Sequence, residues 1–124
     1  MYKHFKLEEF DSPDQRGSGK HMNREFMEML DEAREIADIP FKINSGFRTE
    51  AYQEDLRKRG YKTSKTKSPH EKGVAADIHV VDSTSRWLVI NSLLLAGFTR
   101  IGIADTFIHV DLDLERRHSV VWTY

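Results

Sequence analysis

Three segments of the chain carry apolar residues at the three- and four-residue spacing of an amphipathic helix. We predict helices over residues 23–39, 49–59 and 83–95. Each begins at a residue whose side chain can cap free backbone N–H groups: Asn23, Thr49, and either Ser83 or Thr84. Each ends before a helix-breaking residue, namely Pro40, Gly60 and Gly97.

Shorter apolar or alternating segments between these helices predict strands. They cover residues 41–44, 74–81, 98–103 and 107–112, with a further edge strand over 119–122. Residues 7–22 contain Pro13, Gly17 and Gly19 among polar residues and predict a turn-rich N-terminal arm, while residues 61–72 form a lysine-rich loop. Helices and strands do not strictly alternate, and the last strands follow one another closely. This order favours an α+β fold with a mostly antiparallel sheet and helices packed on one face.

Composition narrows the classes of function. A chain of 124 residues with 39% hydrophobic and 31% charged residues is expected to form one domain over 1–124. With Lys+Arg 19 against Asp+Glu 20, no overall positive charge attracts nucleic acid, and we expect none as a partner. The longest apolar stretch, Trp87–Ala96, is too short to span a bilayer, so we expect no membrane insertion. Residues 1–6 lack the apolar segment of a signal peptide.

Two strands that should be buried contain charged residues, and these indicate a metal site. Because side chains alternate along a strand, Asp77 shares a face with His79, and His109 shares a face with Asp111. An unpaired polar group in a sheet interior costs about 2–7 kcal/mol, so such residues are neutralised by a partner or bind a cation. The chain has Cys 0, and any transition metal must therefore use imidazole and carboxylate ligands.

A third candidate ligand, His70, lies on the loop that enters the strand of Asp77. Two imidazoles and one carboxylate with a free fourth position form an open zinc site. The HExxH helix motif is absent, because Val74 occupies the position of its second histidine. The alternative is that these histidines are ordinary hydrogen-bonded residues of a metal-free structural protein.

The segment that begins at Ser68 contains a longer pattern. Ser68, His70, Gly73, Ala75 and Asp77 reproduce the SxHxxGxAxD motif of the zinc D-Ala-D-Ala carboxypeptidases and L,D-endopeptidases that cut peptidoglycan stem peptides. Residues 45–49, SGFRT, resemble the SGYR[ST] segment of this family, and residues 97–103 with 107–111 resemble its closing hairpin. The chain resembles the small single-domain members, whose fold is shared with the hedgehog signalling domain.

The resemblance implies roles for individual residues. His70, Asp77 and His109 become zinc ligands, Arg48 binds the substrate carboxylate or the developing oxyanion, and Ser68 is a hydrogen-bonding residue of the substrate site that fixes the loop. Alternatively, Arg48 is a solvated arginine paired with Glu50 or Asp55, and Ser68 is a simple turn residue.

The general base is less clearly marked. Many members of the family have an acidic residue three positions before the last histidine, where this chain has Thr106. Asp111 is our preferred candidate: it could accept a proton from the attacking water or orient the ring of His109. Asp105 and Glu71 are less well aimed.

The resemblance implies a zinc-dependent metallopeptidase that hydrolyses peptide bonds in peptidoglycan stem peptides. Basic residues between Arg57 and Lys72 either form a solvated surface or bind the carboxylates of those peptides. We expect a monomer, encoded by a phage or prophage and acting on the cell wall after release. The alternative is a non-catalytic, zinc-stabilised binding module of the cell wall or a phage particle.

Overall fold

A five-stranded sheet forms the centre of the structure, a computed structural model that describes residues 1–61 and 66–124. Its strands are β1 (Ile43–Ser45), β2 (Ala75–His79), β3 (Arg100–Ile103), β4 (Phe107–Asp111) and β5 (Val120–Thr123). Their spatial order is β1-β2-β4-β3-β5, and every pair is antiparallel except β3 with β5. The predicted α+β class with a mostly antiparallel sheet is confirmed. Part of the predicted lysine-rich loop, residues 62–65, lies outside the described residues.

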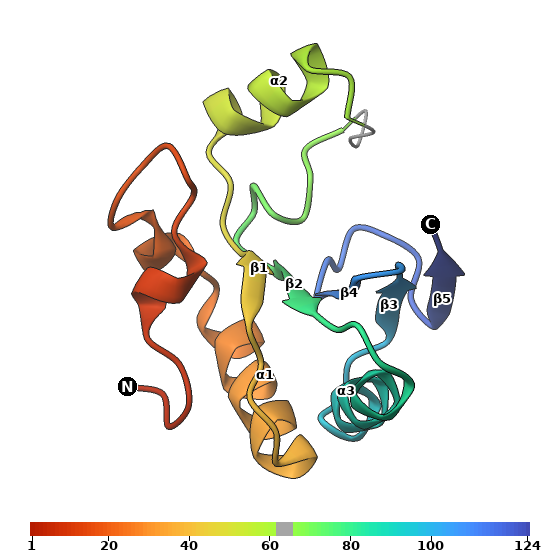
Figure 1. Cartoon of the computed structure of the whole chain (residues 1–124). Helices are drawn as coiled ribbons and strands as arrows, with labels where there is room; N and C mark the ends of the chain where they lie inside the picture. The colour runs from red at the N-terminus through yellow and green to blue at the C-terminus, as the bar shows by residue number, and fades with distance from the viewer. Residues whose placement is uncertain (62–65) are drawn as a thin grey trace.

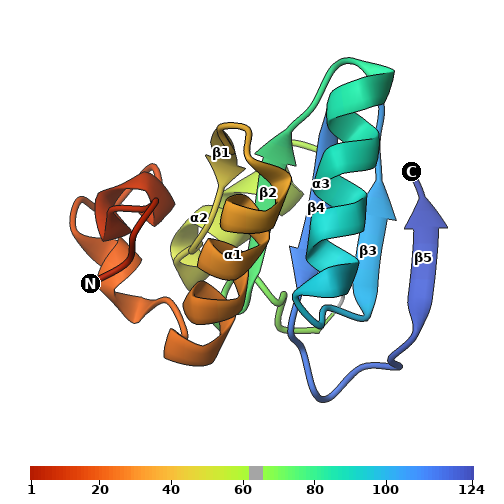
Figure 2. The same ribbon diagram turned by 90° about the horizontal axis from the view of Figure 1, so that it is seen from below.

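The three helices are α1 (Arg24–Ala37), α2 (Glu50–Lys58) and α3 (Ser83–Leu95). The helices α1 and α3 pack against each other on one side of the sheet (Figure 1). Seen from that side, α2 lies behind the sheet (Figure 2). Asn23 and Thr49 cap α1 and α2 as predicted, whereas Asp82, one residue before the predicted serine, caps α3. No helix in the described part of the chain has both the length and the apolar character needed to cross a bilayer.

The N-terminal arm supports the segment that leads into α2. It contains two 3₁₀ helices, η1 (Leu7–Phe10) and η2 (Ser18–His21), and Phe10 is fully buried. The backbone N–H of Phe47 donates to the carbonyl of Phe10 at 2.9 Å, and the hydroxyl of Thr49 donates to Asp14 at 2.7 Å. The arm therefore fixes both neighbours of Arg48, Phe47 and Thr49.

The hydrophobic core occupies the space between the sheet and the α1–α3 pair. Ala76 and Ile78 of β2 and Ile108 and Val110 of β4 are fully buried in it. This is the alternation that the sequence predicted, and it leaves the intervening side chains of both strands on the opposite face. The polar residues of β2 and β4 thus share one face of the sheet.

Candidate metal centre

Strand register brings the first two predicted ligands together. In the antiparallel β2–β4 pair, Asp77 lies directly opposite His109. Side chains in such opposite positions are close neighbours on one face of a sheet. Nδ1 of His109 donates to Oδ1 of Asp77 at 2.9 Å, and both side chains are buried.

The third predicted ligand reaches the same point from a tight loop. Gly73 ends this loop with φ +72°, and a Cβ there would come within 2.4 Å of the carbonyl oxygen of His21, so the position requires glycine. Nδ1 of His70 donates to the carbonyl of Gly46 at 2.8 Å. This bond fixes the ring so that Nε2 is directed to Asp77 Oδ1, 3.5 Å away.

His70, Asp77 and His109 fit a single metal ion. One donor atom from each lies within 4.8 Å of the other two, and all three residues are buried. Two imidazole nitrogens and one carboxylate oxygen are ligands that zinc accepts, and three protein ligands leave a coordination position open. The structure thus juxtaposes all three residues that the sequence selected as ligands.

The charges at this centre are strongly coupled. Burial alone would raise the pKa of Asp77, but His70 and His109 outweigh it and hold that pKa well below its usual range. Burial lowers the pKa of His70. Burial would also lower the pKa of His109, yet hydrogen bonds to Asp111 and Asp77 raise it to about 9. Without a metal, His109 therefore carries a proton on the nitrogen that faces Asp77.

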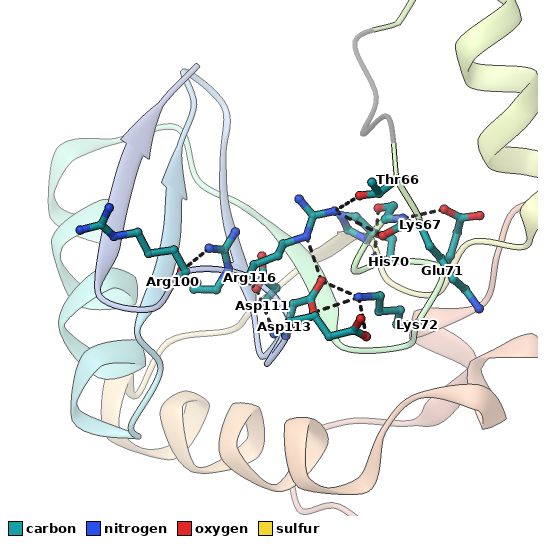
Figure 3. Close-up of polar contacts among 12 residues, drawn as sticks. Thr66, Lys67, His70, Glu71, Lys72, Arg100, Asp111, Asp113 and Arg116 are labelled. Atoms are coloured by element: carbon teal, nitrogen blue, oxygen red, sulfur yellow. Dashed lines mark hydrogen bonds and ion pairs between the residues drawn. The ribbon is translucent and has the colours of Figure 1, made fainter.

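Asp111 contacts Nε2 of His109, the ring nitrogen that does not bond to Asp77. Its Oδ2 accepts from Nε2 of His109 at 2.8 Å. Its Oδ1 accepts from Nε of Arg100 at 2.7 Å, and Figure 3 labels both Asp111 and Arg100. Asp111 is only 1% exposed. These contacts correspond to the second role predicted for it, orientation of the histidine ring, in which a carboxylate fixes the tautomer of a ligand.

Arg100 and Trp122 belong to this arrangement, and the sequence analysis assigned neither to it. The indole of Trp122 lies 5.6 Å from the ring of His109 and 5.1 Å from the guanidinium of Arg100. A Cβ on Gly102 would come within 2.7 Å of this indole, so glycine is needed between β4 and β5. Because side chains alternate along a strand and Ile101 is buried, the sequence could have placed Arg100 on the polar face of the sheet. No local sequence signal indicated that β5 is the neighbour of β3.

A cavity of about 620 Å³ opens over the three predicted ligands. Arg48 lines it and is held at three points: Nε donates to Ser45 Oγ at 3.0 Å, Nη1 donates to Gln53 Oε1 at 3.3 Å, and Nη2 lies 3.5 Å from Asp77 Oδ2. Asp55, a partner considered for Arg48, is paired with Arg59 instead. The guanidinium therefore lies beside the predicted ligands with its orientation fixed.

The remaining predicted residues occupy different positions. Ser68 lines the cavity, and its hydroxyl accepts from the backbone N–H of His70 at 3.2 Å. Glu71 accepts from the backbone N–H of Ser68 at 2.7 Å, whereas Asp105 is exposed in the β3–β4 turn. Among the described residues that line the cavity, Asp77 is the only one with a carboxylate side chain.

Tyr124 also lines this cavity, although the sequence analysis did not select it. Its ring packs edge-on against Phe107 with ring centroids 5.2 Å apart. Burial raises the pKa of its phenol, and the negative charge of Asp77 adds to that shift. A raised pKa keeps the phenol protonated at neutral pH, so its O–H group is a hydrogen-bond donor.

Comparison with known families gives one finding. The family model described as Peptidase M15 matches residues 3–111, a range that contains all three predicted ligands. A search of the curated proteins finds no match.

Substitution of single histidines should distinguish those that bind the metal from those that only lie nearby. We expect His70→Ala to abolish stoichiometric zinc binding, because two ligands remain, whereas His79→Ala on the exposed end of β2 should bind zinc normally. Elemental analysis of the dialysed proteins measures both. Stoichiometric zinc in His70→Ala would contradict the assignment of His70.

The stability of chelator-treated protein should depend on pH through His109. Its pKa in the folded protein, about 9, lies above its ordinary value of 6.5. The resulting stabilisation is fully present below the ordinary value and is lost as pH rises through about 9. Urea denaturation between about pH 6 and about pH 9 should show a falling free energy of unfolding, with a weaker slope in His109→Gln. A flat or rising profile in the unsubstituted protein would contradict the proton shared by His109 and its two carboxylates.

Proposed function

The chain belongs to the peptidase M15 family, and from this premise we propose that it is a zinc-dependent metallopeptidase that hydrolyses a peptide bond in peptidoglycan stem peptides, as a D-Ala-D-Ala carboxypeptidase or an L,D-endopeptidase. The observation that carries this proposal is the convergence of His70, Asp77 and His109 on one point beneath a cavity that Arg48 also lines. This substrate places its site of action at the bacterial cell wall.

The three ligands would hold zinc through one atom each. His70 offers Nε2, because its Nδ1 is bonded to the carbonyl of Gly46, and His109 offers Nδ1, because its Nε2 is bonded to Asp111. Asp77 offers Oδ1, which lies close to both. When bound there, zinc supplies the Lewis acidity that polarises a scissile carbonyl.

Arg48 binds the anionic part of the substrate. A planar guanidinium presents several N–H donors and keeps its charge at any physiological pH. Ser45 and Gln53 hold two of its nitrogens, so the group is oriented before substrate arrives. Such preorganised donors can bind a terminal carboxylate or stabilise the oxyanion that develops at the carbonyl.

Three further residues orient the groups that take part in the reaction. Asp111 holds the ring of His109, and Arg100 holds Asp111 in place. Burial would raise the pKa of Asp111, but His109 and then Arg100 lower it and keep the group ionised. Tyr124, on the cavity wall, donates a hydrogen bond to a substrate carbonyl. Proton acceptance by Asp111 stays a prediction. Its two carboxylate oxygens already accept hydrogen bonds, one from His109 and one from Arg100.

A second function is favoured by the composition of the cavity wall. The described lining residues include no carboxylate side chain besides that of Asp77, which is a predicted ligand. A protein of this fold that holds zinc but lacks a general base would bind cell-wall peptides without cutting them. The second candidate is therefore a non-catalytic, zinc-stabilised binding module of the cell wall.

Hydrolysis of muropeptides separates the two functions. We expect zinc-loaded protein to generate new amine ends, chelator to stop this, and added zinc to restore it. Mass spectrometry then identifies the bond, since release of a single alanine indicates a carboxypeptidase. Retention on insoluble peptidoglycan without any new amine end would contradict the peptidase and support the binding module.

Arg48→Lys should impair catalysis while leaving the metal in place. A lysine keeps the charge but not the fixed fork of donors, and loss of such a donor lowers turnover by about 100-fold. The matched control is Arg59→Lys on the same cavity wall, whose arginine is paired with Asp55. Steady-state kinetics on a D-Ala-D-Ala peptide would contradict the role of Arg48 if both variants kept the full kcat/KM.

A further inference from the structure

Asp113 is a buried carboxylate that the proposed mechanism does not use. It is 2% exposed and follows β4. Its side chain accepts from Nζ of Lys72 at 3.0 and 3.1 Å, from Nε of Arg116 at 2.9 Å and from the backbone N–H of Glu115 at 3.1 Å (Figure 3). Burial would raise the pKa of Asp113, yet these contacts lower it, which keeps the group ionised. A charge buried this completely is costly unless it is fully paired, as it is here.

One partner of Asp113 lies in the loop that carries His70, and a second partner contacts that loop. Lys72 lies two residues after His70 in that loop. Arg116 donates from Nη2 to the hydroxyl of Thr66 at 3.1 Å and to the carbonyl of Lys67 at 3.3 Å, at the other end of the loop. Asp113 therefore joins both sides of the His70 loop to the segment that follows β4.

The same network continues to His109. The backbone N–H of Asp113 donates to Oδ1 of Asp111 at 3.2 Å, and Oδ2 of Asp111 accepts from His109. One connected set of hydrogen bonds thus links the loop of one histidine ligand to the ring of the other. Figure 3 shows this set extending from Arg100 through Asp111 and Asp113 to Lys72 and Thr66.

We propose that Asp113 is a positioning residue of the metal centre, which holds His70 at the distance from His109 that one ion can span. This inference rests on the proposed metal site. The donor atoms of the three ligands lie within 4.8 Å of one another, and a small displacement of the loop would move Nε2 of His70 out of that range. Asp113 and Arg116 lie beyond residue 111, where the family match ends.

A simple electrostatic role makes a different prediction from a positioning role. If Asp113 acted only through its charge, Asp113→Asn would weaken binding of a cation, and Lys72→Met would strengthen it by removing a positive charge. If Asp113 positions the loop, both substitutions break the same contact and both weaken zinc binding. The sign of the Lys72→Met effect therefore distinguishes the two roles.

The test measures the zinc dissociation constant by competition with a chelating indicator at fixed pH. We expect Asp113→Asn and Lys72→Met each to raise the Kd by about tenfold, as is typical for residues that orient metal ligands. The matched control is Asp82→Ala, which removes the cap of α3 and so lowers stability at a site that carries no ligand. Its Kd should equal that of the unsubstituted protein.

A spectroscopic readout complements the affinity. Cobalt(II) reports the geometry of its ligands through its visible absorption bands, and we expect Asp113→Asn to change these bands while Asp82→Ala does not. If Asp113→Asn fails to fold, Lys72→Met and Arg116→Met carry the test with the same expected rise in Kd.

Two results would overturn the positioning role alone: an unchanged Kd in Asp113→Asn and Lys72→Met, or tighter binding in Lys72→Met. Absence of zinc binding by the unsubstituted protein would overturn the metal centre of the proposed function as well, and the two failures are thereby distinguishable.

Discussion

The negative charge of Asp77 in the interior of the sheet is the constraint on which the rest of the site depends. A carboxylate removed from water must be surrounded by positive or hydrogen-bonding groups. Asp77 has His109 at 2.9 Å, His70 at 3.5 Å and Arg48 at 3.5 Å from its two oxygens. The same three groups are those to which the proposed function gives roles at the metal site. The groups that neutralise this buried charge are therefore also the groups that form the proposed catalytic site.

Structural elements of different kinds position these groups around Asp77. The β2–β4 register fixes His109 relative to Asp77 without any loop, so this part of the site is as rigid as the sheet. His70 and Arg48 lie on irregular segments and need other support. The N-terminal arm fixes the neighbours of Arg48, and hydrogen bonds to Gly46 and to the segment after β4 fix the loop of His70. The less regular the segment, the more side-chain hydrogen bonds hold it.

Local sequence signals predicted most of the fold and selected the three candidate ligands that the structure brings together. Periodicity and capping residues located the three helices, and strand alternation placed Asp77 and His109 on the face opposite the core. These signals depend on a few neighbouring residues, which is why they could be interpreted from one sequence. Asp82 as the cap of α3 was missed because Ser83 and Thr84 are equally good caps. The roles of Arg100, Asp113 and Trp122 depend on contacts between distant segments, and no local pattern encodes the parallel pairing of β5 with β3.

The most direct test of the central claim is the position of the metal in zinc-loaded crystals, located by anomalous scattering at the zinc absorption edge. The account predicts one peak bonded to Nε2 of His70, Oδ1 of Asp77 and Nδ1 of His109, with nitrogen ligands at about 2.0–2.1 Å. A peak elsewhere, or zinc bound without either histidine, would contradict it.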